Sequence, residues 1–196
     1  MIRIAVVGDI GSGKSYVARQ FGYPVFDADV EVNKLYRKNK KCYIKLKKAL
    51  PNYINSFPIK KTKLSSAIMS DKNNLKKIIK IIHPEVRKRM KNFVRKNKNK
   101  KIVILDIPLL MENKINEKGD VLIFIEAKKK EIIKRLKKRP GVNLKMIRNF
   151  KKLQLPVEIK KKRSDFIIKN NFKNKSTKKS VKKVLREILL NVRSNT

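Results

Sequence analysis

Residues 8–15 read GDIGSGKS and have the residue types and spacing of a loop that holds phosphate groups. They fit the pattern G-x-x-x-x-G-K-[ST], in which glycines let backbone N–H groups approach phosphate oxygens without a Cβ between them. Lys14 could reach the β- and γ-phosphates of a nucleotide, and the Ser15 hydroxyl could ligate Mg²⁺. The motif therefore predicts that the chain binds a nucleoside triphosphate.

The segments on either side of this loop support the same prediction. Residues 2–7 are rich in β-branched side chains, and Val17, Ala18 and Phe21 recur at helical spacing after the loop. A helix in this place would point the positive end of its dipole at the phosphates. The alternative, a glycine-rich turn with no ligand, explains neither the lysine and serine nor the order of strand, loop and helix.

A pair of carboxylates follows the second predicted strand, in the sequence VFDADVEV. In an extended chain Asp27 and Asp29 would point to the same side, and the carboxyl ends of parallel strands face the ligand crevice. A carboxylate there could accept the proton of a hydroxyl that receives a phosphoryl group. The alternative is an acidic turn that caps the next helix, and the spacing alone leaves both open.

Three further residues are candidates for a site. His83, the single histidine, stands in IIHPEV, where it is either functional or a helix-boundary residue before Pro84. Asp106 ends the predicted strand in ILDIPLLMEN and could hold a Mg²⁺-bound water, and Glu112 follows soon after. The alternative for both acids is an ordinary loop at a strand end.

Five segments that read as buried strands must position these residues: 2–7, 24–26, 102–106, 121–125 and 166–168. Helical patterns lie between them, which predicts an α/β fold with a five-stranded parallel sheet flanked by helices. A stripe of apolar residues from Val181 to Val192 predicts a C-terminal packing helix, with Ser180 as its N-cap.

Residues 1–196 are predicted to form a single phosphate-loop kinase domain. Two stretches within it have predicted roles. Residues 30–95 carry mostly helical signals and are predicted to be an insertion that binds the acceptor substrate. Residues 128–163 form a basic helix–loop–helix pattern that would suit a lid over the phosphates.

The composition limits the possible partners. The chain has 196 residues and a formal net charge of +39, and its lysines are spread along the sequence rather than gathered in one segment. This spread indicates a compositional bias more than a nucleic-acid footprint, although a positive field would attract anionic substrates. Cys42 is the single cysteine, so no disulfide forms within the chain. Without a visible signal peptide or long apolar run, we expect a cytoplasmic protein with no membrane and no specific nucleic acid among its partners.

Several ordered motifs together resemble the dephospho-CoA kinase family. They are the GDIGSGKS loop, FDADVEVNKLY, LKKIIKIIHPEVRKRM, VILDIPLLMENK, IKRLKKR and LQLPVEIKKKRSDFIIKNN, and they cover nearly the whole chain. The resemblance implies a phosphate-loop kinase fold, with a helical substrate region and a lid. It also implies transfer of the ATP γ-phosphate to the ribose 3′-hydroxyl of dephospho-CoA with the help of Mg²⁺, which is the last step of coenzyme A synthesis.

The resemblance also implies roles for individual residues. The predicted nucleotide site comprises Gly11, Ser12, Gly13, Lys14, Ser15 and Tyr16. The predicted catalytic residues are Lys14, Asp29 as general base and Arg139 in the lid. Asp27, His83 and Glu112 are predicted to bind the acceptor. Ser15 and Asp106 are predicted to bind the metal. The family loop usually has Gly where Asp9 stands and Thr where Tyr16 stands, and the charge of Asp9 is expected to weaken nucleotide binding.

Two other functions remain as alternatives. One is another small-molecule kinase, acting on a nucleoside or a nucleoside monophosphate, against which the DAD and HPEV…IPLLME pairings speak. The other is a nucleic-acid-binding phosphate-loop protein, suggested by the net charge. Aromatic residues make up only 7% of the chain and do not cluster on the predicted strands, so a base-stacking surface is not apparent.

Overall fold

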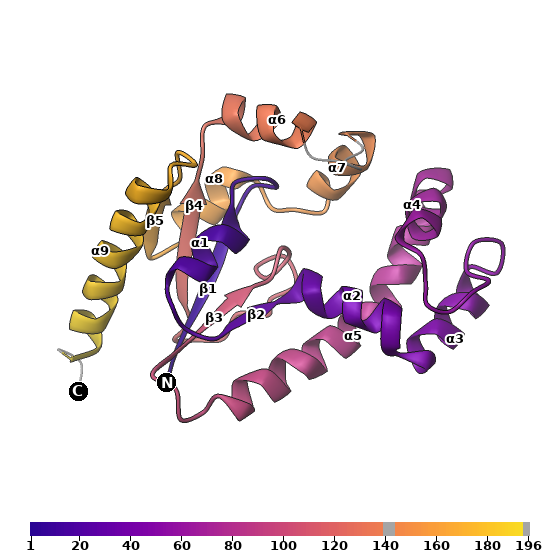
Figure 1. The fold of residues 1–196 in the computed structure, drawn as a ribbon, viewed down its shortest axis with the longest axis horizontal. Helices are drawn as coiled ribbons and strands as arrows, with labels where there is room; N and C mark the ends of the chain where they lie inside the picture. Colours follow the sequence, from indigo (N-terminus) through magenta and orange to yellow (C-terminus); the bar gives the residue numbers. More distant parts are fainter. Residues whose placement is uncertain (139–143, 194–196) are drawn as a thin grey trace. The chain divides into compact units, whose positions relative to one another are not determined.

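A computed structural model describes residues 1–138 and 144–193 of the chain (Figure 1). The chain divides into two units, one made of residues 1–27 and 97–196 and the other of residues 28–96. The predicted substrate insertion, residues 30–95, falls inside the second unit. Among the described residues, no helix has the length and apolar character that crossing a membrane requires.

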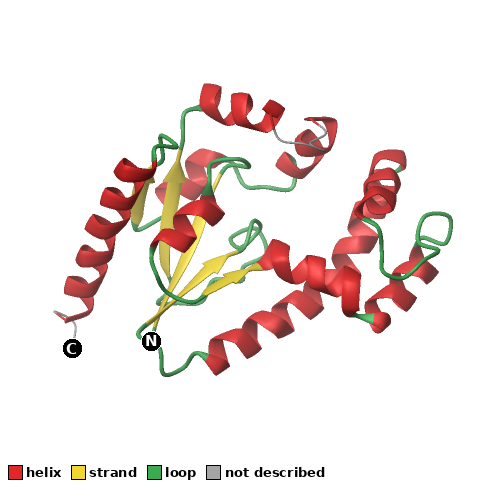
Figure 2. Cartoon of the chain, viewed as in Figure 1, coloured by secondary structure: helices red, strands yellow, loops and turns green. Residues whose placement is uncertain are grey.

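The first unit is built on a parallel sheet whose strands, yellow in Figure 2 and labelled in Figure 1, run in the order β2-β3-β1-β4-β5. The strands are β1 (Ile2–Gly8), β2 (Val25–Asp27), β3 (Ile102–Asp106), β4 (Val121–Glu126) and β5 (Phe166–Lys169). Each neighbouring pair is parallel. The predicted five-stranded parallel sheet is thus confirmed. Its central strands are apolar along their length because helices bury both faces.

One face of the sheet is covered by α1 (Lys14–Gln20) and α9 (Asn174–Arg193). Ile4 and Ile104 from the strands form a single buried cluster with residues of both helices. The cluster also contains Val17 and Ala18 of α1, the residue Phe21 that caps its C-terminus, and Val181, Val184 and Ile188 of α9. The C-terminal stripe therefore packs as predicted. The predicted N-cap is wrong, because α9 begins at Asn174 and Ser180 lies inside the helix.

Three more helices of the first unit lie between β4 and β5. They are α6 (Lys129–Lys138), α7 (Leu144–Lys151) and α8 (Val157–Lys162). All three fall within residues 128–163, the segment predicted as the lid, and α8 packs against β1. This segment is strongly basic: the last turn of α6 alone carries Arg135, Lys137 and Lys138.

The second unit consists of α2 (Ala28–Lys38), α3 (Lys40–Ala49), α4 (Lys61–Ser70) and α5 (Lys72–Lys96). The long helix α5 packs against the other three. Leu35, Leu46, Leu64, Ile78 and Ile82 are all buried, so this unit has a hydrophobic core of its own. Asn39 begins α3 by accepting a hydrogen bond from the Cys42 N–H at 2.9 Å.

Two local expectations are wrong. Asp27 is the last residue of β2, but Asp29 lies in the first turn of α2, so the two carboxylates are not arranged along an extended chain. An acidic residue in a first helical turn is favoured by the helix dipole. His83 is not at a helix boundary either, since α5 continues through Pro84. The apolar face of α5, with Ile78, Ile82 and Val86 buried, outweighs the hydrogen bond that proline removes.

Candidate functional site: the phosphate loop and its surroundings

The loop between β1 and α1 has the backbone geometry that its glycines predict. Gly13 precedes the first residue of α1, with φ of 91°, in the left-handed region that favours glycine. Gly8 has φ of 151°, and a Cβ there would lie 2.7 Å from the carbonyl oxygen of Ile125. The strand therefore passes into the loop at a position where only a glycine fits.

Asn170, directly after β5, is hydrogen-bonded to the phosphate loop. Its side chain is buried, and its Nδ2 donates a hydrogen bond to the carbonyl oxygen of Ser12 at 2.8 Å. Its Oδ1 accepts from the Phe172 N–H at 3.0 Å and from the Thr177 hydroxyl at 3.1 Å. A Cβ on Gly13 would lie 2.3 Å from Nδ2, so this contact also requires glycine. Sequence reasoning missed Asn170, whose only signal is an amide immediately after a buried strand.

Two polar side chains of the loop are suited to an anion. The Lys14 ammonium lies over the loop and donates to the carbonyl oxygens of Asp9 at 2.8 Å and Gly8 at 3.3 Å. The Ser12 hydroxyl is fully buried and has no hydrogen-bond partner within the described part of the chain. Phosphate oxygens would supply an acceptor to both groups, so the loop fits the ligand that its sequence predicts. The Tyr16 hydroxyl instead donates to Asn174 at the start of α9.

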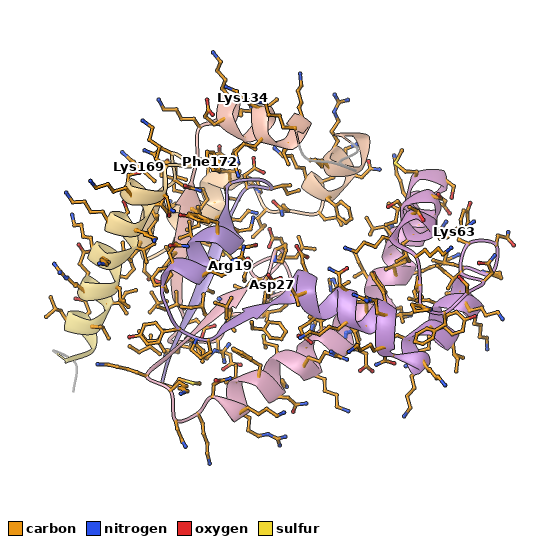
Figure 3. All side chains as sticks on the ribbon, in the orientation of Figure 1. Arg19, Asp27, Lys63, Lys134, Lys169 and Phe172 are labelled. Atoms are coloured by element: carbon orange, nitrogen blue, oxygen red, sulfur yellow. The ribbon has the colours of Figure 1, made fainter. Side chains whose placement is uncertain are left out.

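Two carboxylates lie at the carboxyl ends of the neighbouring strands β2 and β3, at the end of the sheet where the phosphate loop begins. Asp106 ends β3, is 3% exposed, and is paired in register with Asp27 at the end of β2. Because Ile102 and Ile104 face α1, alternation places Asp106 on the same face of the sheet. Arg19 of α1 lies 3.7 Å from Asp27 (Figure 3). The carboxyl ends of adjacent strands thus bring together two acids that sequence reasoning assigned separately.

These acids fit a particular kind of metal site. Among the described residues, no group of three or more histidine, cysteine, aspartate or glutamate side chains is placed to hold a metal ion. Mg²⁺ is usually bound by one or two protein oxygens together with substrate phosphates and waters. Ser15 in the first turn of α1, with Asp106 and Asp27 at the strand ends, provides hard oxygen donors of that kind.

The helix α6 packs directly on the phosphate loop. A Cβ on Gly11 would lie 3.1 Å from carbon atoms of Ile132 and Leu136, both of which are buried. Lys151, in the last turn of α7, forms an ion pair with Asp9 of the loop at 2.9 Å. The predicted lid segment is therefore in contact with the loop in this structure. Arg139, its predicted phosphate-binding residue, lies outside the described residues.

The aromatic side chain of Phe172, which follows β5, lies beside the phosphate loop and contacts α6. Phe172 has φ of 62°, which is uncommon for a residue other than glycine. The Arg135 guanidinium lies 4.4 Å from the centre of its ring, within the range of a cation–π contact. Figure 3 shows Phe172 near the top of the sheet, beside the loop. This contact adds a second link between α6 and the body of the unit.

Glu112 is part of a buried polar cluster. One of its carboxylate oxygens lies 3.1 Å from the Lys160 ammonium and accepts from the Leu155 N–H at 3.0 Å. The Lys160 side chain, 2% exposed, also donates to Gln154 at 3.0 Å. The cluster ties the loop after β3 to the segment that leads from α7 into α8. Sequence reasoning missed Lys160, which was hidden among neighbouring exposed lysines.

Comparisons with known proteins place this chain in a family. The sequence model of the family described as dephospho-CoA kinase matches residues 2–176. The dephospho-CoA kinase of Wolbachia sp. subsp. Brugia malayi is 35% identical over 170 residues, which cover 84% of this chain and 87% of that protein. This chain belongs to the dephospho-CoA kinase family.

Solved structures agree with the family assignment. A Thermus thermophilus protein has a TM-score of 0.75 and 27% identity, with 97% of each chain covered. A dephospho-CoA kinase from Campylobacter jejuni has a TM-score of 0.61 and 26% identity, with 95% of this chain and 96% of that chain covered. The predicted phosphate-loop kinase fold is confirmed by these neighbours.

The remaining predicted site residues lie in the second unit. Asp29 is exposed in the first turn of α2, and His83 is half-buried on α5. Burial, reinforced by the nearby Arg87 charge, lowers the pKa of His83. On the same two helices, Glu31 forms an ion pair with Arg89 at 2.8 Å. Burial, with smaller effects of Cys42 and Asp29, raises the pKa of Tyr36 to about 12, so its hydroxyl keeps its proton at neutral pH.

Proposed function

We propose that this chain transfers the γ-phosphate of ATP to the ribose 3′-hydroxyl of dephospho-CoA, giving coenzyme A and ADP. The observation that carries the proposal is a phosphate loop built on Gly8 and Gly13, with Lys14 over it, in a chain that the family model matches over residues 2–176. The cytoplasmic location stays a prediction.

The loop would hold the phosphates through its backbone N–H groups, the Ser12 hydroxyl and Lys14. On nucleotide binding, the Lys14 ammonium would exchange the carbonyl oxygens of Gly8 and Asp9 for oxygens of the β- and γ-phosphates. A fixed positive charge there stabilises the charge that shifts toward the leaving group during transfer. The N-terminus of α1 would add its dipole at the same place.

Mg²⁺ is proposed as the metal of this reaction. Ser15 would ligate it directly, and Asp106, with Asp27 beside it, would hold its waters. When bound, the ion neutralises phosphate charge and orients the γ-phosphoryl group. The two acids would also keep this side of the site negative enough to attract the cation.

The acceptor side is proposed from the family resemblance. Asp29 would take the proton of the 3′-hydroxyl, with Asp27 as the competing candidate, and His83 would contact the acceptor. Arg139, in the predicted lid, would contact the phosphates. Glu112 Oε1 already contacts Lys160 and the Leu155 N–H, and these two contacts favour a role in supporting the segment before α8 over a role in binding the acceptor.

The function is tested by incubating purified protein with ATP, Mg²⁺ and one candidate acceptor at a time, while ADP release is followed. The acceptors are dephospho-CoA, nucleosides, nucleoside monophosphates and oligonucleotides. ADP release should depend on dephospho-CoA. Equal or greater stimulation by a nucleoside monophosphate would refute the proposed acceptor and favour the second kind of kinase.

A further inference from the structure

Asp9 occupies the second position of the phosphate loop, where a negative charge is unexpected beside the proposed nucleotide phosphates. Its side chain is only 16% exposed, and each of its carboxylate oxygens has a partner. One oxygen accepts from the Ile10 N–H at 2.7 Å, and the other lies 2.9 Å from the Lys151 ammonium. The carboxylate is therefore held in place rather than directed freely into the loop.

The same residue contacts a second lysine through its backbone. The carbonyl oxygen of Asp9 accepts from Lys14 at 2.8 Å and from the Ser12 N–H at 3.2 Å. Asp9 thus joins the loop lysine on one side to α7 on the other. Lys151 stands in the last turn of α7, so the ion pair fixes the end of that helix beside the loop.

We propose that Asp9 and Lys151 form a positioning pair, which holds α7 against the phosphate loop and cancels the charge that would otherwise repel the nucleotide. The proposal rests on the proposed function, because it assumes that the loop binds ATP phosphates. Neither residue is assigned to the chemical step. The pair acts on nucleotide affinity, through the position of α7 and through the local field.

The proposal predicts that the effects of the two residues differ in a defined way. Lys151→Gln leaves the Asp9 carboxylate uncompensated beside the phosphates, so nucleotide binding should weaken. Asp9→Asn keeps an acceptor for the Ile10 N–H and leaves no negative charge beside the phosphates. It should therefore weaken nucleotide binding less than Lys151→Gln does. Adding Asp9→Asn to Lys151→Gln should restore most of the lost affinity, because no uncompensated charge remains. A residue that matters only for packing would not give this restoration.

The experiment measures binding of a non-hydrolysable ATP analogue with Mg²⁺ by calorimetry. Lys151→Gln should raise the dissociation constant about fivefold, the factor that matches the upper end of exposed ion-pair energies. The double variant should return to within about twofold of Asp9→Asn. Lys151→Arg keeps the charge and should bind like wild type. Lys152→Gln, a charge removal at the adjacent exposed lysine, is the matched control and should also bind like wild type.

Hydrogen exchange gives a second readout that needs no nucleotide. Amides of α7 (Leu144–Lys151) should exchange faster in both single variants and no faster still in the double variant, since either change breaks the pair. Exchange in β1 and β3 should stay unchanged, which shows that the variants are folded. If Lys151→Gln leaves both affinity and α7 exchange unaltered, or if the double variant binds as poorly as Lys151→Gln, the proposal is overturned.

These readouts separate the pair from the proposed reaction. Neither binding of the analogue nor exchange of α7 requires phosphoryl transfer. If the wild-type protein forms no coenzyme A yet the variants behave as expected, the proposed function fails and the pair stands. If coenzyme A is formed normally but the variants bind alike, only the pair is refuted.

Discussion

The buried ion pair between Glu112 and Lys160 offers a quantitative test of the structure. Lys160→Met removes the ammonium and leaves the Glu112 carboxylate, 9% exposed, with the hydrogen bond from the Leu155 N–H. Breaking one member of a buried pair leaves an uncompensated charge in a poorly solvated site. The free energy of unfolding should therefore fall by about 3–5 kcal/mol.

The thermal midpoint should change accordingly. For a chain of this length roughly 2–4 °C corresponds to 1 kcal/mol, so the midpoint should fall by about 6–20 °C. Replacing both members, with Glu112→Leu added to Lys160→Met, removes both charges and should recover a large part of the loss. Circular dichroism during heating measures all variants, and Lys161→Met, at a surface ion pair with Glu126, is the matched control.

The control should lose no more than about 1 kcal/mol, because an exposed pair gains little in water. Two results would refute the reasoning. One is a Lys160→Met variant that melts like the control. The other is a double variant that loses the sum of both single effects, since that would mean that the two side chains do not interact.

Three further predictions concern the site and its charges. Lys14→Ala should lower kcat by more than about tenfold, which is roughly 1.4 kcal/mol of transition-state stabilisation, with an unchanged thermal midpoint; a smaller loss would deny the lysine its proposed role. The pKa of His83 is lowered from its ordinary 6.5, so the unfolded chain takes up this proton first. The contribution of His83 to the free energy of unfolding should be complete above pH 6.5 and should be lost as the pH drops toward the native pKa. His83→Gln, compared by urea unfolding, should lack this decline. If the charge of +39 is compositional, oligonucleotide binding should be weak and fall steeply with added salt, whereas sequence-selective binding at physiological salt would revive the nucleic-acid alternative.

The sequence was sufficient for features that depend on local pattern. The loop was predictable because glycines, lysine and serine stand at fixed spacing between a strand and a helix. The strands of the sheet were predictable because β-branched runs mark buried parallel strands. Each of these signals is contained in a few consecutive residues of the chain.

Features that depend on strand order were not predictable in the same way. Asp27 and Asp106 are neighbours only because β3 lies between β2 and β1, an order that the chain sequence does not display. Asn170 reaches the Ser12 carbonyl oxygen across the sheet, and its own sequence neighbourhood carries no motif for that contact. Asp29 was misplaced because the transition from strand to helix came one residue before it.

Charge patterning does not distinguish individual lysines in this chain. Lys160 and Lys151 stand in runs of lysine that look uniformly solvated in the sequence. Only the fold shows that one is buried against Glu112 and that the other meets Asp9. In a chain this basic, composition conceals which cations have a structural role.

The identity of the product decides whether this chain phosphorylates dephospho-CoA on its ribose 3′-oxygen. Wild-type protein is incubated with ATP, Mg²⁺ and dephospho-CoA, and the product is analysed by mass spectrometry and by phosphorus NMR. We expect coenzyme A with its new phosphate monoester on the ribose 3′-oxygen, in equal amount to the ADP released. ADP release without coenzyme A, or a phosphate on any other oxygen, would contradict it.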